Sequence, residues 1–411
     1  MPSLKGSLFL VGLTVALGGC EQMLTVAAFE PEQQGGQYGL IGAPVNVPPA
    51  VVVRNQDGRP VRGVDVMFQV TEGSGSISPA RVKTDDQGIA RAGAWVLQAG
   101  NNGAVATVAR EGVMGSPVSF TATGGPSQFN VELQYISNLA PSQQAAFDRA
   151  AARWQELIIG DVEDSRGSIP AASCGDNSPA LTDQFIDDLL IFVDVRSIDG
   201  PGRSLARSGV CYVRTTDRMP VIGLMQFDAD DMPALESRGL LQAVVMHEMA
   251  HVLGFGSTQA WADRIKNPSS PSAPQDTSFS GAFAIRAFDG LGGTSYRAGP
   301  KVPVENTGGQ GTQNSHWRES VLRSELMTGY ANEGTNPVSG ASIAAFWDLG
   351  YRVNLSGAES YTLSLGLREG EGAQGIDLGD DVLLRPIRSG GAPLAGPGPG
   401  AVGGGQWAVN F

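Results

Sequence analysis

The stretch "HEMAHVLGFGS", residues 247–257, places two histidines four residues apart, with a glutamate directly after the first. Residues i and i+4 lie on one face of a helix, so His247 and His251 can point at the same metal ion. Zinc takes histidine nitrogens in tetrahedral geometry, and a catalytic zinc keeps one position for water. Glu248 lies beside that face, where its carboxylate can accept a proton from the water. The stretch predicts a zinc site with Glu248 as general base.

A pattern of five residues also occurs by chance, and histidine pairs on helices are often only solvated or buried. The flanks "LLQAVVM" and "VLGF" are apolar, as expected for a helix that crosses a core. Two of the three histidines of the chain lie in this motif. Six residues after His251 stands Ser257, a poor zinc ligand. The third ligand is therefore His316, a carboxylate such as Asp263, or absent.

The segment "HWRESVLRSELMTG", residues 316–329, follows the third histidine with a methionine eleven residues later. This arrangement resembles the leishmanolysin family of metzincins, in which HExxHxxGF is followed by an insertion, a third zinc histidine and a methionine turn. Three further segments resemble the same family: "FSGAFAIRAFDGLGG", "KVPVENTGGQGTQNSHW" and "PVSGASIAAFWDLGYRV".

The resemblance implies a role for each residue of the pattern. His247, His251 and His316 would bind one zinc ion, Glu248 would act as general base and acid, and Met327 would form the floor of the site.

The implied reaction is hydrolysis of peptide bonds in a protein or peptide substrate. Metzincins align such a substrate along an edge strand, and "GLMQFD" is the expected strand here. An inactive surface adhesin on the same fold, or a zinc hydrolase acting on a non-peptide substrate, are the alternatives. The sequence does not address calcium.

The first 19 residues have the features of a signal peptide. Lys5 precedes an apolar run, residues 8–17, which is too short to span a bilayer and suits a signal core. The run ends in "LGGC", which resembles the lipobox of bacterial lipoproteins and implies lipidation of Cys20. An ordinary secretory signal with an incidental cysteine is the alternative. Because Glu21 is not the aspartate of inner-membrane retention, the outer membrane or the cell surface is the expected location.

The predicted export affects the expected redox state of the two remaining cysteines, Cys174 and Cys211. An oxidising compartment favours a disulfide between them. Closing a loop of this length would stabilise the fold by about 4 kcal/mol in the chain-entropy model. Two buried free thiols are the alternative.

Length and composition indicate a multidomain protein. A chain of 411 residues suggests two or three domains, and 41% hydrophobic residues suffice to bury real cores. The net charge of −13 argues against nucleic acid as a partner, because phosphate binding requires clustered lysine and arginine.

Residues 37–127 are predicted to form an all-β domain after a linker at 20–36. In "GVDVMFQV", residues 63–70, apolar side chains alternate as in a half-buried strand, and turn-forming residues flank it. The segment from "VVVRNQDGRP" to "GIARAGAWVL" resembles the bacterial immunoglobulin-like domains of invasin- and intimin-type adhesins. That resemblance implies a β-sandwich that acts as a spacer or in cell-surface adhesion.

Residues 128–356 are predicted to form an α+β domain of the metzincin type. A helix is expected at 141–160 and a second one around the zinc motif, with buried strands "LLIFVDV" and "GLMQFDADD" between them. Residues 258–315 have the composition of loops. The C-terminal extension, 357–411, contains the strand candidates "YTLSL" and "DVLLRPI" and a Gly/Pro-rich stretch that is expected to be flexible.

Overall fold

The structure is a computed structural model that describes residues 23–30, 36–309, 311–365, 375–378, 382–384 and 387–388. The predicted signal peptide, Cys20 and the Gly/Pro-rich C-terminal stretch lie outside these residues. The described chain divides into two compact units, one of which lies within residues 23–122. The other contains Thr123 onward together with Tyr38–Asn46 and Val96–Gly100. Among the described helices, none is both long and apolar enough to cross a lipid bilayer.

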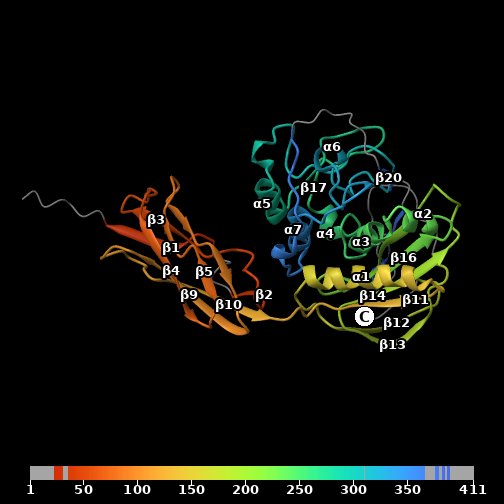
Figure 1. The fold of residues 1–411 in the computed structure, drawn as a ribbon, viewed down its shortest axis with the longest axis horizontal. Helices are drawn as coiled ribbons and strands as arrows, with labels where there is room; N and C mark the ends of the chain where they lie inside the picture. The colour runs from red at the N-terminus through yellow and green to blue at the C-terminus, as the bar shows by residue number, and fades with distance from the viewer. Residues whose placement is uncertain are drawn as a thin grey trace, which may run out of the picture. The chain divides into compact units, whose positions relative to one another are not determined.

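The N-terminal part of the described chain is built from strands (Figure 1). One sheet has the order β1–β3–β7, a second has the order β2–β10–β9–β4–β6, and β5 pairs with β8. The strands are β1 (Leu24–Ala28), β2 (Gln37–Leu40), β3 (Ala50–Asn55), β4 (Asp65–Glu72), β5 (Ser76–Ser78), β6 (Arg81–Lys83), β7 (Ile89–Arg91), β8 (Ala94–Val96), β9 (Gly100–Val108) and β10 (Val118–Gly125). Val66 and Phe68 of β4 are buried, in agreement with the predicted alternation. The immunoglobulin-like classification stays a prediction.

Strand β1 corrects part of the predicted linker at residues 20–36. It pairs antiparallel with β3, and its side chains Leu24 and Val26 are buried. Five residues with two buried positions give too weak an alternation to distinguish a strand from a linker by sequence.

The second unit is built on a six-stranded sheet in the order β11–β14–β16–β15–β21, in which β22 also pairs with β15. The strands are β11 (Val131–Tyr135), β14 (Leu189–Arg196), β15 (Ala206–Val213), β16 (Pro220–Asp228), β21 (Val382–Leu384) and β22 (Ile387–Arg388). Strands β11, β14 and β16 run parallel, whereas β15 is antiparallel to β16. The two long predicted strands therefore lie side by side in the interior of the sheet.

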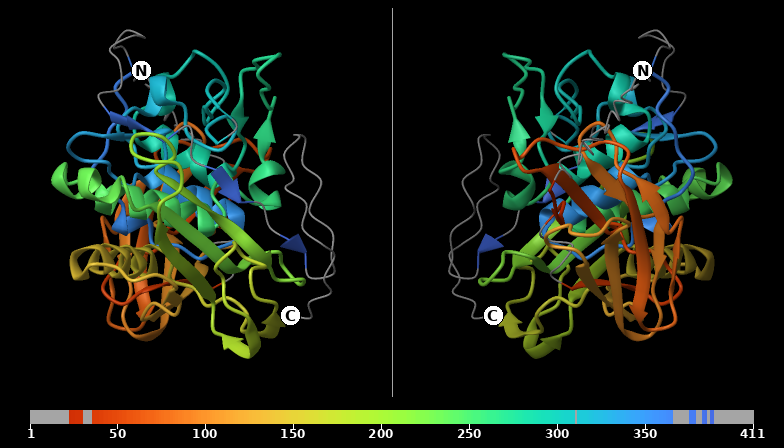
Figure 2. Two further views of the ribbon diagram at one scale, coloured as in Figure 1. Left: turned by 90° about the vertical axis from the view of Figure 1, so that its right-hand side faces the viewer. Right: turned by 90° about the vertical axis from the view of Figure 1, so that its left-hand side faces the viewer.

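Helices α1 (Pro141–Leu157) and α3 (Leu241–Val252) lie against each other and over one face of this sheet (Figures 1 and 2). The predicted stripe of α1 is buried in the core beneath it: Phe147, Ala150, Trp154 and Leu157. The Trp154 indole donates a hydrogen bond to the carbonyl of Met246 over 3.1 Å. This bond joins α1 to the helix that contains the zinc motif.

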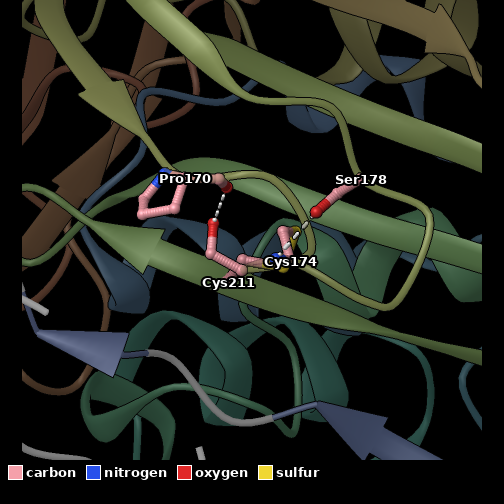
Figure 3. The surroundings of a disulfide bond; sticks show 5 residues. Pro170, Cys174, Ser178 and Cys211 are labelled. Carbon is pink, nitrogen blue, oxygen red and sulfur yellow. Dashed lines mark hydrogen bonds between the residues drawn. A yellow bond between two sulfur atoms is a disulfide. The ribbon is translucent and has the colours of Figure 1, made fainter. Parts of the chain in front are cut away.

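The opposite face of the sheet is covered by the hairpin of β12 (Ser165–Ile169) and β13 (Leu181–Ile186) and by the loop between them. In this loop Cys174 forms a disulfide with Cys211 of β15, and its backbone N–H donates to the hydroxyl of Ser178 (Figure 3). The structure thus joins the two cysteines that the sequence analysis pairs.

The region 258–315, predicted to consist of loops, contains regular elements. They are α4 (Gln259–Ala262), β17 (Ile265–Lys266), β18 (Ser278–Phe279), α5 (Ala282–Gly290) and the 3₁₀ helix η2 (Gly293–Ser295). Helix α5 packs on α7 (Gly340–Leu349), where Phe283 stacks on Trp347 with ring centroids 3.8 Å apart. The many glycines of α5 and its surroundings hide this helix from composition alone.

The remaining elements are α2 (Met232–Ser237), α6 (Glu319–Leu322), β19 (Tyr330–Asn332), η3 (Leu355–Gly357) and β20 (Gly375–Asp377). The predicted strand "YTLSL" (361–365) is wrong, because it pairs with no strand among the described residues. The side chain of Leu363 is buried, and its backbone N–H donates to the carbonyl of Leu291. The segment "DVLLRPI" (381–387) contains β21 and the first residue of β22, so the C-terminal extension adds strands to the main sheet.

Candidate metal centre

Three histidine rings meet at one point in the second unit. The Nε2 atom of His247 lies 3.0 Å from that of His251 and 3.0 Å from that of His316, and the third separation is 3.1 Å. All three side chains are buried. His247 and His251 come from α3, and His316 comes from a segment 65 residues beyond His251. The structure therefore brings together the three residues that the sequence analysis assigns to zinc.

The other nitrogen of each ring has a hydrogen-bond acceptor. His247 Nδ1 lies 2.7 Å from the carbonyl oxygen of Leu326, and His251 Nδ1 lies 2.7 Å from that of Phe255. His316 Nδ1 lies 3.2 Å from the carbonyl oxygen of Thr312. A carbonyl can only accept, so each Nδ1 carries the proton and each Nε2 presents a lone pair to the common point.

Burial keeps these rings neutral. It lowers the pKa of His247 to about 4, with a smaller opposing effect from the carbonyl of Leu326. Burial also lowers the pKa of His251 and of His316 well below the usual value, and the neighbouring ring of His247 adds to this. Neutral imidazole is the form that binds a metal ion.

The donor set fits zinc. A tetrahedral zinc with Zn–N distances of about 2.0–2.1 Å places its nitrogens about 3.3 Å apart, which the observed triangle matches within a few tenths of an ångström. Three neutral imidazoles also leave a fourth position, as catalytic zinc sites do.

Gly256 allows the chain of His316 to approach helix α3. A Cβ at this position would lie 2.5 Å from the carbonyl oxygen of Ser315, and its φ of 74° is in the left-handed region. Any other residue would push the third histidine away from the first two.

The turn around Met327 holds two of the ligands in place. The carbonyl of Leu326 accepts from His247, and the carbonyl of Met327 accepts from the N–H of Trp317, next to His316. Met327 itself is fully buried. The turn is supported from below by Glu325, whose carboxylate accepts bonds from four donors: the backbone N–H of Met327, the backbone N–H and hydroxyl of Ser339, and the hydroxyl of Ser342.

Glu248 is buried and lies on α3 between the two histidines. Its Oε2 accepts a hydrogen bond from the hydroxyl of Ser208, in β15. Neither Ser208 nor Glu325 was predicted: Ser208 lies outside every motif, and the role of Glu325, although it lies within "HWRESVLRSELMTG", arises from bonds to the distant Ser339 and Ser342.

Ser257, at the position of the usual third histidine, and Asp263, the alternative carboxylate ligand, have other roles. The Ser257 hydroxyl donates to the carbonyl of His251 over 2.6 Å and so caps the end of α3. Asp263 is exposed, and its carboxylate accepts from Gln259 over 2.8 Å.

Residues 178–366 match the family model of leishmanolysin. This matched region includes all three histidines, Glu248 and Met327. Over 165 residues the chain is 30% identical to a leishmanolysin homolog of Crithidia fasciculata, an alignment that covers 38% of this chain. Over 172 residues it is 30% identical to leishmanolysin of Leishmania donovani, which covers 40% of this chain. The chain spans only 24% and 28% of the length of these two relatives.

Proposed function

We propose that residues 128–356 form a zinc-dependent endopeptidase domain that hydrolyses peptide bonds of extracytoplasmic proteins. The observation that carries this proposal is the convergence of three Nε2 atoms within 3.1 Å of one another, two of them from the helix that contains Glu248 and one from His316. The leishmanolysin match over residues 178–366 supports it.

The residues of the site divide the chemistry between them. A zinc ion on the three histidines would supply Lewis acidity, which polarises the scissile carbonyl and lowers the pKa of a water. Glu248 would take the proton of that water and later donate it to the leaving amine. The carbonyl groups of Leu326 and Phe255 hold the imidazoles of His247 and His251 in one orientation throughout.

The order of the sheet corrects the expected substrate strand. Strand β16, which contains "GLMQFD" (223–228), is paired with β14 on one side and β15 on the other, so it has no free edge. We infer that an extended peptide lies along β15, the strand that contacts Glu248 through Ser208. Strands β21 and β22 of the C-terminal extension pair with that same edge, so a substrate peptide on β15 would have to displace them.

We also propose that the protein is exported and anchored to a bacterial membrane by a lipid on Cys20, at the outer membrane or the cell surface. The support is the sequence of residues 1–20. Residues 37–127 would then serve as an immunoglobulin-like spacer between anchor and protease, or in adhesion. Replacement of Cys20 by serine should release the protein from membranes; continued membrane association would contradict the anchor.

The proposed activity is tested with the purified protein and its Glu248→Ala variant. The zinc content of both is measured, and both are incubated with a denatured protein, a peptide library and small ester substrates. We expect equal zinc in the two proteins and cleavage of peptides by the parent alone. A zinc-loaded parent that cleaves no peptide would favour the inactive adhesin, and cleavage of esters alone would favour a non-peptide hydrolase.

A further inference from the structure

The contact between Ser208 and Glu248 connects the main sheet to the zinc-motif helix. Ser208 lies in β15 and has no exposed surface, and its hydroxyl donates to Oε2 of Glu248, 40 residues further along the chain. Glu248 has no exposed surface either. The hydrogen bond is therefore shielded from water, and a hydroxyl that donates to a carboxylate there forms a strong, charge-assisted bond.

Gly223 explains why the helix lies close enough for this contact. A Cβ on Gly223 of β16 would lie 2.2 Å from Cγ1 of Val252 in α3 and 3.0 Å from the carbonyl oxygen of Gly209 in β15. Val252 is one helical turn after Glu248, and it occupies the space that a side chain at 223 would take. Helix and sheet are thus held at a short, fixed separation, and Ser208 reaches across it.

A glutamate has three rotatable side-chain bonds, so its carboxylate takes one orientation only when another group holds it. A general base acts when its oxygen lies within about 2.6–3.2 Å of the proton that it accepts. Because the Ser208 hydroxyl donates a hydrogen bond to Oε2, it restricts the rotation of the carboxylate, and Oε1 then points in one direction.

We infer that Ser208 is a positioning residue for Glu248: its hydroxyl orients the carboxylate for proton transfer. This inference rests on the endopeptidase function proposed above. In this role the Ser208 hydroxyl acts through Glu248, so its loss lowers the rate of the reaction rather than metal binding.

The experiment uses the full chain with Ser208→Ala, which removes one oxygen and fits the same space. Ser178→Ala is the matched control, since Ser178 also has a buried hydroxyl, which accepts from the backbone of Cys174. We expect kcat for peptide hydrolysis to fall about tenfold in Ser208→Ala, as the loss of one hydrogen bond to a charged group predicts. KM, zinc content and the unfolding midpoint should match those of the control.

A second readout does not depend on turnover. Acetohydroxamate, a small zinc chelator, donates its proton to a correctly placed carboxylate, so its Kd reports on the orientation of Glu248. Ser208→Ala should raise this Kd about three- to tenfold in the parent. In the Glu248→Ala background the same change should have no effect, because there is then no carboxylate to orient.

Unchanged kcat and Kd in Ser208→Ala would overturn the inference. So would an equal rise of Kd in both backgrounds, or a loss of zinc, because each would give Ser208 a different role. A parent that cleaves no peptide would refute the proposed function, whereas the acetohydroxamate cycle would still show whether Ser208 orients Glu248.

Discussion

At the scale of single residues, Glu325 supports the three-histidine cluster without belonging to it. Its buried carboxylate accepts hydrogen bonds from Met327, Ser339 and Ser342, and so connects the methionine turn to the start of α7. The carbonyl of Leu326, within this turn, holds His247. The orientation of His247 therefore depends on a carboxylate that is not part of the histidine cluster.

Replacing Glu325 with alanine should leave several buried donors without an acceptor. We expect the free energy of unfolding to fall by at least about 3 kcal/mol and zinc affinity to fall with it. Urea denaturation and zinc titration measure the two effects. Glu333→Ala, at an exposed ion pair with Arg238, is the control and should change neither. If Glu325→Ala binds zinc like the parent, the turn is not held by this carboxylate.

Glu319 makes stability depend on pH. Burial raises the pKa of its carboxyl to about 7, above the ordinary value of about 4.3 for an unfolded chain. Between these values the folded state holds a proton that the unfolded state has lost, so stability falls as pH rises from 4.3 to 7.

Glu319→Gln mimics the protonated acid and should remove this loss. The expected gain over the parent at pH 8 is about 1–2 kcal/mol, a figure reduced for partial exposure of the group, and it should vanish at pH 4. Urea denaturation at the two pH values measures it. A gain of the same size at both would show that proton binding by Glu319 is not the cause.

At the scale of elements, strand β15 connects the main sheet to Glu248, to the disulfide and to the C-terminal extension. It lies beyond β16 in the sheet, contributes Ser208 to Glu248 and Cys211 to the disulfide, and pairs along its outer edge with β21 and β22. Its antiparallel direction is the exception among the long strands.

Removal of residues 379–411 should free the edge of β15. If an extended peptide pairs with this strand, as proposed, kcat/KM for long peptides should rise several-fold, while activity on the shortest cleavable peptides changes less. Steady-state kinetics on peptides of graded length measures the effect. An unchanged or lower kcat/KM for long peptides would show that β21 and β22 do not occupy the substrate edge.

The elements also show what the sequence could predict. Helix α1 and strand β14 were predictable because periodicity and apolar runs are local properties. The order of the strands in the sheet is not a local property. Strand β16 is apolar because it lies in the interior of the sheet, but any buried strand is apolar, so its sequence does not show which strands lie beside it. The same holds for Ser208 and Glu325, whose roles arise from contacts with distant segments. His316 was predictable only through its family resemblance.

At the scale of the whole molecule, the three-histidine cluster lies entirely in the second unit, and the family match begins at residue 178. A chain that starts at Gln128 should therefore fold, bind zinc and cleave peptides like the full chain. Circular dichroism, zinc content and kcat/KM check this. This fragment lacks Tyr38–Asn46 and Val96–Gly100, two segments that also belong to the second unit. A soluble, zinc-loaded but inactive fragment would mean that the N-terminal region takes part in catalysis.

The central claim is that His316, brought to α3 from beyond the insertion, completes a three-histidine zinc site. The most direct test is the zinc content and zinc affinity of His316→Ala compared with Ser257→Ala, measured by elemental analysis and competitive titration. Loss of one of three nitrogen ligands should weaken zinc binding by at least about tenfold to a hundredfold, whereas Ser257→Ala removes only a helix-end hydrogen bond and should retain the metal. Full zinc occupancy and affinity in His316→Ala would contradict the claim.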